Sequence, residues 1–161
     1  MNKDKLIEMG FKLYAEMHAG GDLKHGVELK YIMERNKAKF QPVVYCYVSI
    51  DGYIIYIGQS SKADQRFHVN YRMTKNETND RIRAHVKNGN NLFLYVLPLK
   101  VTMDRLPGWT TKFPKWTSPS IVEECLINEY KKANDGKYPP LNVNRNHKTY
   151  KDTKKSCQKI W

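Results

Sequence analysis

Two apolar runs rich in β-branched and aromatic residues, residues 43–50 and 53–58, flank an Asp-Gly pair and constrain the fold more than any other stretch of the chain. Asp-Gly between such runs is a strong signal for a two-residue β-hairpin, because a type I′ turn needs positive φ at both central residues. The sequence therefore predicts two paired antiparallel strands, with Asp51 and Gly52 as the turn.

This turn decides which side chains face one another across the predicted hairpin. Tyr45 lies opposite Gly58, and Tyr47 lies opposite Tyr56. Side chains alternate between the two faces of a strand, so the three tyrosines share one face and Gly58 leaves an open space in front of Tyr45. Tyrosine favours strands, so ordinary packing would by itself explain such a cluster. The residues that follow the hairpin favour a functional role for these tyrosines in addition to packing.

The balance of charges indicates a polyanionic partner. Lysine and arginine number 28 against 16 aspartate and glutamate residues, which gives a net charge of +12 on 161 residues. This balance favours nucleic acid, although a ribosomal or nonspecific RNA-binding protein would share it. No run approaches the roughly 20 apolar residues of a membrane span, and the N-terminus lacks the apolar core of a signal peptide.

The number and spacing of the three cysteines also limit the class of protein to which the chain can belong. Cys46, Cys125 and Cys157 are odd in number and form no Cys-x-x-Cys pair. This usage predicts reduced thiols, an intracellular protein and no structural zinc.

Apolar periodicity predicts the remaining elements. Residues 4–18 are predicted to form one helix, and Asp22 is predicted to cap a second. After the hairpin the pattern indicates, in order, a helix, a short basic helix over 79–88, a third strand over 92–99 and a last helix capped by Ser120. The fold class is α/β, or α+β in looser usage: a small antiparallel sheet of about three strands packed by helices.

Helical periodicity separates two adjacent carboxylates in the last helix. Glu123 shares an apolar stripe with Leu126, Ile127 and Tyr130, whereas Glu124 belongs to a polar stripe. A carboxylate that points toward the core is unfavourable unless a metal ion or a hydrogen-bonded cation compensates it. Glu123 is therefore the candidate for a functional carboxylate.

Arg66 raises the same question on the helix that follows the hairpin. It lies on one stripe with Val69 and Met73, and an arginine on an apolar stripe is rarely buried without a partner. One interpretation is an ion pair with a core carboxylate. The other is a clamp on a phosphate, to which a planar guanidinium can donate two hydrogen bonds.

Five elements in this order resemble the GIY-YIG nuclease family, and the resemblance extends over residues 42–144. They are Val43-Val44-Tyr45, Tyr56-Ile57-Gly58, Arg66, Glu123 and Pro139-Pro140-Leu141-Asn142. In that family two strands carry the tyrosines, the next helix carries an arginine and a later helix carries a metal-binding glutamate. The apolar start of the first strand and the Pro-Pro-x-Asn ending are most similar to the phage endonuclease II subgroup.

The sequence departs from the family pattern at three places. The glycine that opens the family name is Val43 here, and Asn70 stands where many members carry histidine or tyrosine. The basic residue expected between the first and second helices has three candidates: Lys75, Arg81 and Arg83. Tyr47 is too close in sequence to Tyr56 to serve as the first tyrosine.

The resemblance implies a DNA endonuclease that hydrolyses phosphodiester bonds. In the implied mechanism Tyr45 is the general base, Tyr56 assists in positioning and Arg66 stabilises charge on the phosphate. Glu123 holds one Mg²⁺ or Mn²⁺ ion, and Asn142 braces the site by hydrogen bonding. The partner is double-stranded DNA, with candidate contacts from His68, Lys75, Arg81, Arg83, Lys87, Lys112 and Lys115.

The resemblance also implies a division of the chain into an N-terminal helical extension over 1–41, a nuclease core over 42–144 and a basic tail over 145–161. One active site cuts one strand, so a double-strand break needs a homo-oligomer or sequential nicks. The protein is expected inside the cell, in the host cytoplasm if it is phage-encoded. Two alternatives stay open: a DNA-binding module of this fold that does not cut, and a basic RNA-binding protein whose tyrosines stack bases.

Overall fold

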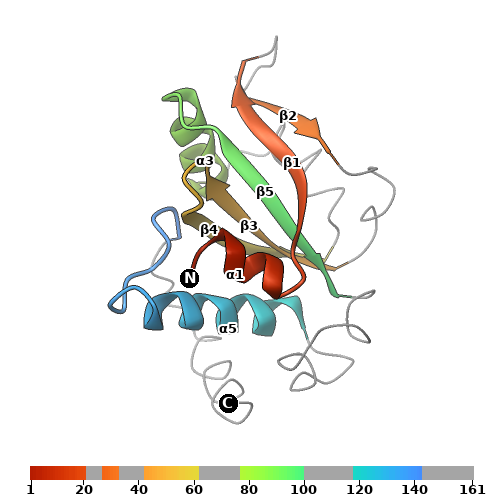
Figure 1. Ribbon diagram of the computed structural model, residues 1–161. Helices are drawn as coiled ribbons and strands as arrows, with labels where there is room; N and C mark the ends of the chain where they lie inside the picture. The colour runs from red at the N-terminus through yellow and green to blue at the C-terminus, as the bar shows by residue number, and fades with distance from the viewer. Residues whose placement is uncertain (21–26, 33–41, 62–76, 100–117, 143–161) are drawn as a thin grey trace.

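A five-stranded antiparallel sheet forms the centre of the computed structural model, with the strand order β2-β1-β5-β3-β4 (Figure 1). The structure describes residues 1–20, 27–32, 42–61, 77–99 and 118–142. The architecture is α+β as expected, but the expected three strands are five. The elements are α1 (Lys3–Glu8), β1 (Lys12–Ala19), β2 (Val27–Tyr31), β3 (Val43–Ser49), β4 (Ile54–Ser60), α3 (Glu77–Lys87), β5 (Leu92–Pro98) and α5 (Pro119–Lys132).

The predicted helix over residues 4–18 is wrong, because α1 ends at Glu8 and β1 begins at Lys12. Gly10 has a φ of 90°, and its N–H donates to Ile7, while the N–H of Phe11 donates to Leu6. These two bonds close the helix in a Schellman motif, whose left-handed position favours glycine. The apolar residues beyond Gly10 then pack as a strand.

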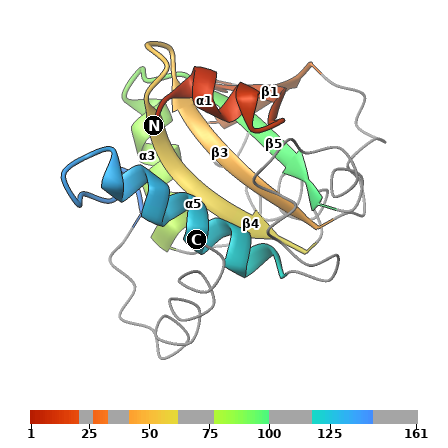
Figure 2. The ribbon, with the colours of Figure 1, turned by 60° about the horizontal axis from the view of Figure 1, so that its bottom comes forward.

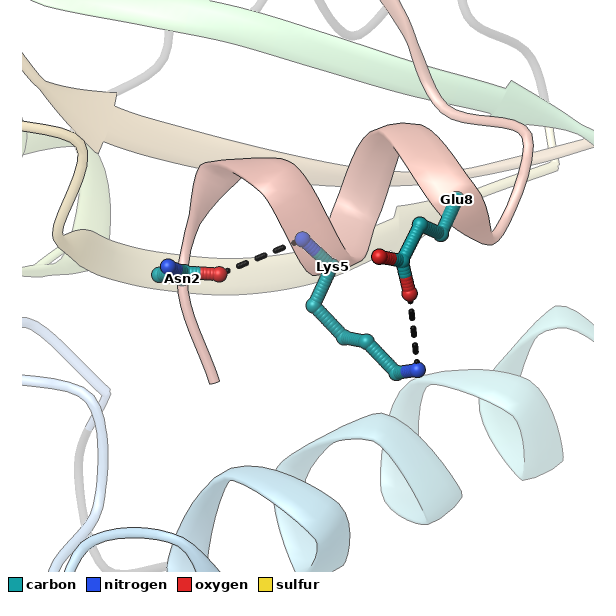
Figure 3. A network of polar contacts seen from close by, with 3 residues as sticks. All are labelled: Asn2, Lys5 and Glu8. Atoms are coloured by element: carbon teal, nitrogen blue, oxygen red, sulfur yellow. Dashed lines mark hydrogen bonds and ion pairs between the residues drawn. The ribbon is translucent and has the colours of Figure 1, made fainter.

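Helix α1 is short, and polar contacts hold its exposed side. The side chain of Asn2 accepts a hydrogen bond from the backbone N–H of Lys5, and the Lys5 ammonium pairs with Glu8 at 2.9 Å (Figure 3). The first contact satisfies an N–H that has no partner within the helix. On the opposite side, Leu6 is fully buried and anchors α1 to the sheet.

The helix expected after Asp22 is also wrong, because Val27–Tyr31 forms β2 at one edge of the sheet. Here the half-buried residues Val27, Leu29 and Tyr31 alternate with two exposed charged residues. This is the period of two that a strand requires. Strand β2 pairs with β1, and β1 pairs with β5. Strands β1 and β2 thus belong to the same sheet as the hairpin, and the proposed division of the chain into domains stays a prediction.

The predicted hairpin is present, but its turn differs. Ser49 N–H donates to Tyr53, and Gly52 N–H donates to Ser49, so the loop has three residues and Gly52 alone has positive φ. The predicted two-residue turn is therefore wrong. A bulge between the pairs Val48–Ile54 and Tyr47–Tyr56 offsets the longer loop, and the predicted pairing is confirmed beyond it.

Helices cover both faces of the sheet (Figure 2). Alternate residues of β3 point to opposite sides, so Tyr45 and Tyr47 lie on one face and Cys46 lies on the other. Helix α3 packs on the tyrosine face through Ile82 and Val86. Helices α1 and α5 pack on the face of Cys46. Two apolar layers therefore enclose the central strands.

The helix over 79–88 and the third strand are confirmed as α3 and β5. Helix α5 is present as expected, but its N-cap is Ser118 rather than Ser120. Within the described parts of the chain, no helix is both long and apolar enough to cross a membrane.

Candidate active site

Three tyrosine rings form a cluster on one face of the β3–β4 hairpin. The ring centroids of Tyr45 and Tyr47 are 5.8 Å apart, those of Tyr45 and Tyr56 are 6.0 Å apart, and those of Tyr47 and Tyr56 are 6.3 Å apart. Their exposed fractions are 0%, 0% and 3%. The shared face predicted from the sequence is confirmed, and the rings are core residues rather than an open platform.

Gly58 explains how the phenol of Tyr45 fits into this cluster. The two residues are direct partners across β3 and β4. A Cβ at Gly58 would stand 2.7 Å from Cζ and 2.8 Å from the hydroxyl oxygen of Tyr45, and 2.5 Å from Cε1 of Tyr56. The open space expected in front of Tyr45 thus exists, and the ends of the two tyrosine rings occupy it. Any side chain larger than hydrogen would displace them.

Strand β4 is the last strand of the sheet, and residues 141–142 bind its outer edge. The side-chain amide of Asn142 accepts from the N–H of Ile57 at 2.9 Å and donates to its C=O at 2.8 Å. The N–H of Leu141 donates to the C=O of Ile55 at 2.9 Å. Asn142 therefore imitates a neighbouring strand and fixes the backbone directly before Gly58. The hydrogen bonds of Asn142 are thus observed, whereas its expected role of bracing a catalytic site stays a prediction.

Helix α5 orients the two adjacent carboxylates as periodicity predicts. Glu123 is 4% exposed, whereas Glu124 is only half-buried. Burial raises the pKa of the Cys46 thiol well above its usual range, and the charge of Glu123 raises it further. The apolar residues of α5, the helix that carries Glu123, pack on the face of the sheet opposite the tyrosine rings. Helix α5 packs against both β3 and β4, so it covers the sheet as far as the edge strand β4.

The described basic candidates on α3 have different surroundings. Arg81 pairs with Glu77 at 3.3 Å and is about one-third exposed, and Lys87 is exposed. Arg83 is only 6% exposed and pairs with Asp80. Arg81 and Lys87 are thus available to a surface ligand, while Arg83 faces the sheet. Outside the described residues lie Arg66, His68, Lys75, Lys112 and Lys115.

The inward direction of Arg83 could have been found in the sequence. The buried residues Asn79, Ile82, Arg83 and Val86 follow the helical spacing of three and four that marks one face. Two polar residues, Asn79 and Arg83, therefore belong to the buried stripe of this basic helix.

Other ligand groups are few in the described residues. No three His, Cys, Asp or Glu side chains of this part of the chain gather as metal ligands. Cys46 is a free, buried thiol as expected. Cys125 is disulfide-bonded, so the expectation of reduced cysteines is wrong at this residue.

The sequence matches no protein-family model and no curated protein. Among solved structures, a mutant of bacteriophage T4 EndoII has a TM-score of 0.46 and 19% identity, over 60% of this chain and 71% of that chain. Restriction endonuclease HPY188I in complex with product DNA has a TM-score of 0.47 and 16% identity, over 90% of this chain and 87% of that chain. Both likenesses are too distant to carry an argument about function.

Proposed function

We propose that this protein is a DNA endonuclease of the GIY-YIG type, which hydrolyses phosphodiester bonds in double-stranded DNA. One observation carries the proposal: the phenol of Tyr45 lies over Gly58 on an edge strand, beside Tyr56, and Asn142 braces that strand. These residues are four of those that the family resemblance selects from the sequence.

In the proposed mechanism Tyr45 acts as the general base that removes a proton from the attacking water. A phenol has a pKa of about 10, so its anion needs a neighbouring cation near neutral pH. Of the two described candidates, Arg83 faces the sheet and Arg81 faces solvent, which favours Arg83. Tyr45 is fully buried, so the proposal requires its hydroxyl to become accessible to water when DNA binds.

The other proposed roles follow from residue chemistry. Tyr56 contacts the ring of Tyr45 and assists in positioning it. Arg66 stabilises the charge that develops on the scissile phosphate, since preorganised guanidinium donors suit that task. Asn142 keeps the edge strand in register beneath the phenol.

Glu123 is the residue that would hold Mg²⁺ or Mn²⁺. Helix α5 packs on the face of the sheet opposite Tyr45, so the proposal requires the metal and the general base to reach one phosphate from the two sides of the edge strand β4. A magnesium ion is commonly held by one or two carboxylates together with waters and substrate phosphates, so the single buried carboxylate of Glu123 is sufficient for it. A structural zinc ion, by contrast, needs four protein ligands. When bound, the ion would supply Lewis-acid stabilisation of the leaving oxygen. The protein's own contribution is a carboxylate held in a fixed direction by the packing of α5.

Burial of the tyrosines also bears on the alternatives. A base can stack only on an exposed ring face, and Tyr45, Tyr47 and Tyr56 offer none. This disfavours the RNA-binding alternative in which they stack bases. A DNA-binding module that does not cut remains the second candidate, because burial of Tyr45 would suit a purely structural ring.

Cutting both strands would need a homo-oligomer or two successive nicks.

Supercoiled plasmid tests the proposal, with Mg²⁺ or Mn²⁺ and with neither. We expect metal-dependent nicking by the wild type and a reduction of about 100-fold or more in Tyr45→Phe, which keeps the ring but removes the base. Tyr53→Phe is the matched control, since Tyr53 lies at the hairpin tip and is 68% exposed. Wild-type protein that binds plasmid without nicking it would leave the DNA-binding module as the better proposal.

A further inference from the structure

We propose that Tyr47 is a positioning residue, whose ring holds the general base Tyr45 in its working orientation. The inference rests on the proposed function and assigns a role to a tyrosine outside the family motif. Tyr47 lies two residues beyond Tyr45 on β3, so both side chains leave the same face of the sheet. It is fully buried in the tyrosine layer.

Tyr47 contacts both tyrosines of the candidate site. Its ring meets that of Tyr45 edge to face, at 5.8 Å between centroids and 80° between planes. It also lies 6.3 Å from the ring of Tyr56, its direct partner across the hairpin. The edge-to-face arrangement is a preferred geometry of aromatic pairs, and an aliphatic side chain does not reproduce it.

Two contacts at different ends restrict the ring of Tyr45. Tyr47 lies against the ring, and the backbone of Gly58 lies under its hydroxyl end. A tyrosine side chain has two main torsions, so contacts at these two places define its orientation. Without the ring of Tyr47, the phenol would keep its supports at Gly58 and at the ring of Tyr56, but it would lose the edge-to-face support on the other side of its ring. A misplacement of about 1 Å can reduce a catalysed rate about 100-fold.

Two variants at this position separate the ring from its hydroxyl. Tyr47→Phe keeps the ring, and we expect single-turnover nicking within about threefold of the wild type. Tyr47→Leu removes the ring, and we expect the rate at saturating protein to fall about 10-fold to 100-fold while DNA affinity stays unchanged. If the leucine variant does not fold, Tyr47→Met takes its place, because methionine adapts to irregular gaps in a core.

Tyr14 provides a matched control on the same face of the sheet. It is 1% exposed and makes an edge-to-face contact with Tyr31, at 5.6 Å between centroids. Tyr14→Leu should lower the thermal midpoint to a similar extent as Tyr47→Leu but leave the nicking rate near the wild-type value. This comparison separates a loss of core packing from a loss of positioning.

The outcomes distinguish this inference from the proposed function. A wild-type protein that does not nick DNA overturns both. If the wild type nicks and Tyr45→Phe does not, the function stands, and a Tyr47→Leu variant with the wild-type rate overturns the positioning role alone. Equal rate losses in Tyr14→Leu and Tyr47→Leu would also overturn it. An inactive Tyr47→Phe would make the hydroxyl, not the ring, the working group.

Discussion

The phenol end of Tyr45 lies over the backbone of Gly58 so closely that a Cβ on Gly58 would stand 2.7 Å from Cζ of Tyr45. Real Cβ atoms do not approach other atoms to this distance, so a side chain at Gly58 and the present ring position exclude one another. The residue that completes the Tyr-Ile-Gly motif is therefore required by a ring on the neighbouring strand, and not by an unusual backbone angle.

Gly58→Ala should uncouple activity from folding. The added methyl group must push aside the ends of two aromatic side chains, so we expect nicking to fall about 10-fold or more, with a folded protein by circular dichroism. Gln59→Ala, at the next residue of β4, is the control. A Gly58→Ala protein as active as the wild type would mean that the ring of Tyr45 need not occupy this position.

Removing the amide of Asn142 should destabilise the protein and reduce cleavage. Asn142→Ala leaves the N–H and C=O of Ile57 without their side-chain partner, at a cost of about 1–3 kcal/mol in urea unfolding. Asn90→Ala loses one exposed hydrogen bond, to His85, and should change stability by less than about 1 kcal/mol. Equal losses in the two variants would mean that the edge of β4 does not depend on Asn142.

The adjacent carboxylates of α5 should respond in opposite ways. Glu123→Ala should abolish nicking while DNA binding remains or tightens, because it removes the metal ligand and a negative charge together. Glu124→Ala, on the half-buried side, should retain activity. If Glu124→Ala is the inactive variant, the metal ligand has been misassigned.

Stability should fall in alkali through Cys46. Burial raises the pKa of this thiol above its ordinary value near 9, so the unfolded chain loses the proton first as pH rises. The unfolded state then binds fewer protons than the folded state, and the stabilising contribution, complete below pH 9, is lost above it. Thermal midpoints between about pH 8 and pH 11 should decline less steeply in Cys46→Ala. Parallel declines would assign the alkaline instability to other groups.

The salt dependence of DNA binding should separate the basic residues of α3. Arg81→Ala and Lys87→Ala should each reduce the slope of log affinity against log salt by about 0.9, if each side chain contacts one phosphate. Arg83→Ala should lower the thermal midpoint instead, because this arginine is buried beside Asp80. Slopes that change for neither Arg81→Ala nor Lys87→Ala would mean that the exposed side of α3 does not contact DNA.

Local patterns were sufficient for the hairpin and for the direction of Glu123. The tyrosine pairing follows from β-strand alternation, and the burial of Glu123 follows from the period of α5. The first strand was missed because its apolar residues, read together with those before Gly10, also fit helical spacing. Only the positive φ of Gly10 and the tertiary pairing with β5 decide that these residues form a strand rather than a helix. A short stretch of sequence does not show which distant segment will pair with it.

For the hairpin, the sequence predicts the strand pairing correctly but predicts the turn type wrongly. The loop is one residue longer than Asp-Gly alone predicts, and the bulge at Ile55 compensates for that residue. Asp-Gly is common to both turn types, so the sequence could not distinguish them. The alternating side chains of the two strands that flank Asp-Gly were still enough to place Tyr45 opposite Gly58.

The contacts of residues 141–142 with β4 also bear on solubility. They engage the C=O of Ile55 and both backbone groups of Ile57, which are the groups that an incoming strand from another molecule would bind. A shortened chain that stops before Leu141 would expose these groups next to a strongly apolar strand. Such a fragment would be prone to join other copies edge to edge, so its failure in an assay would reflect aggregation rather than the loss of a chemical group.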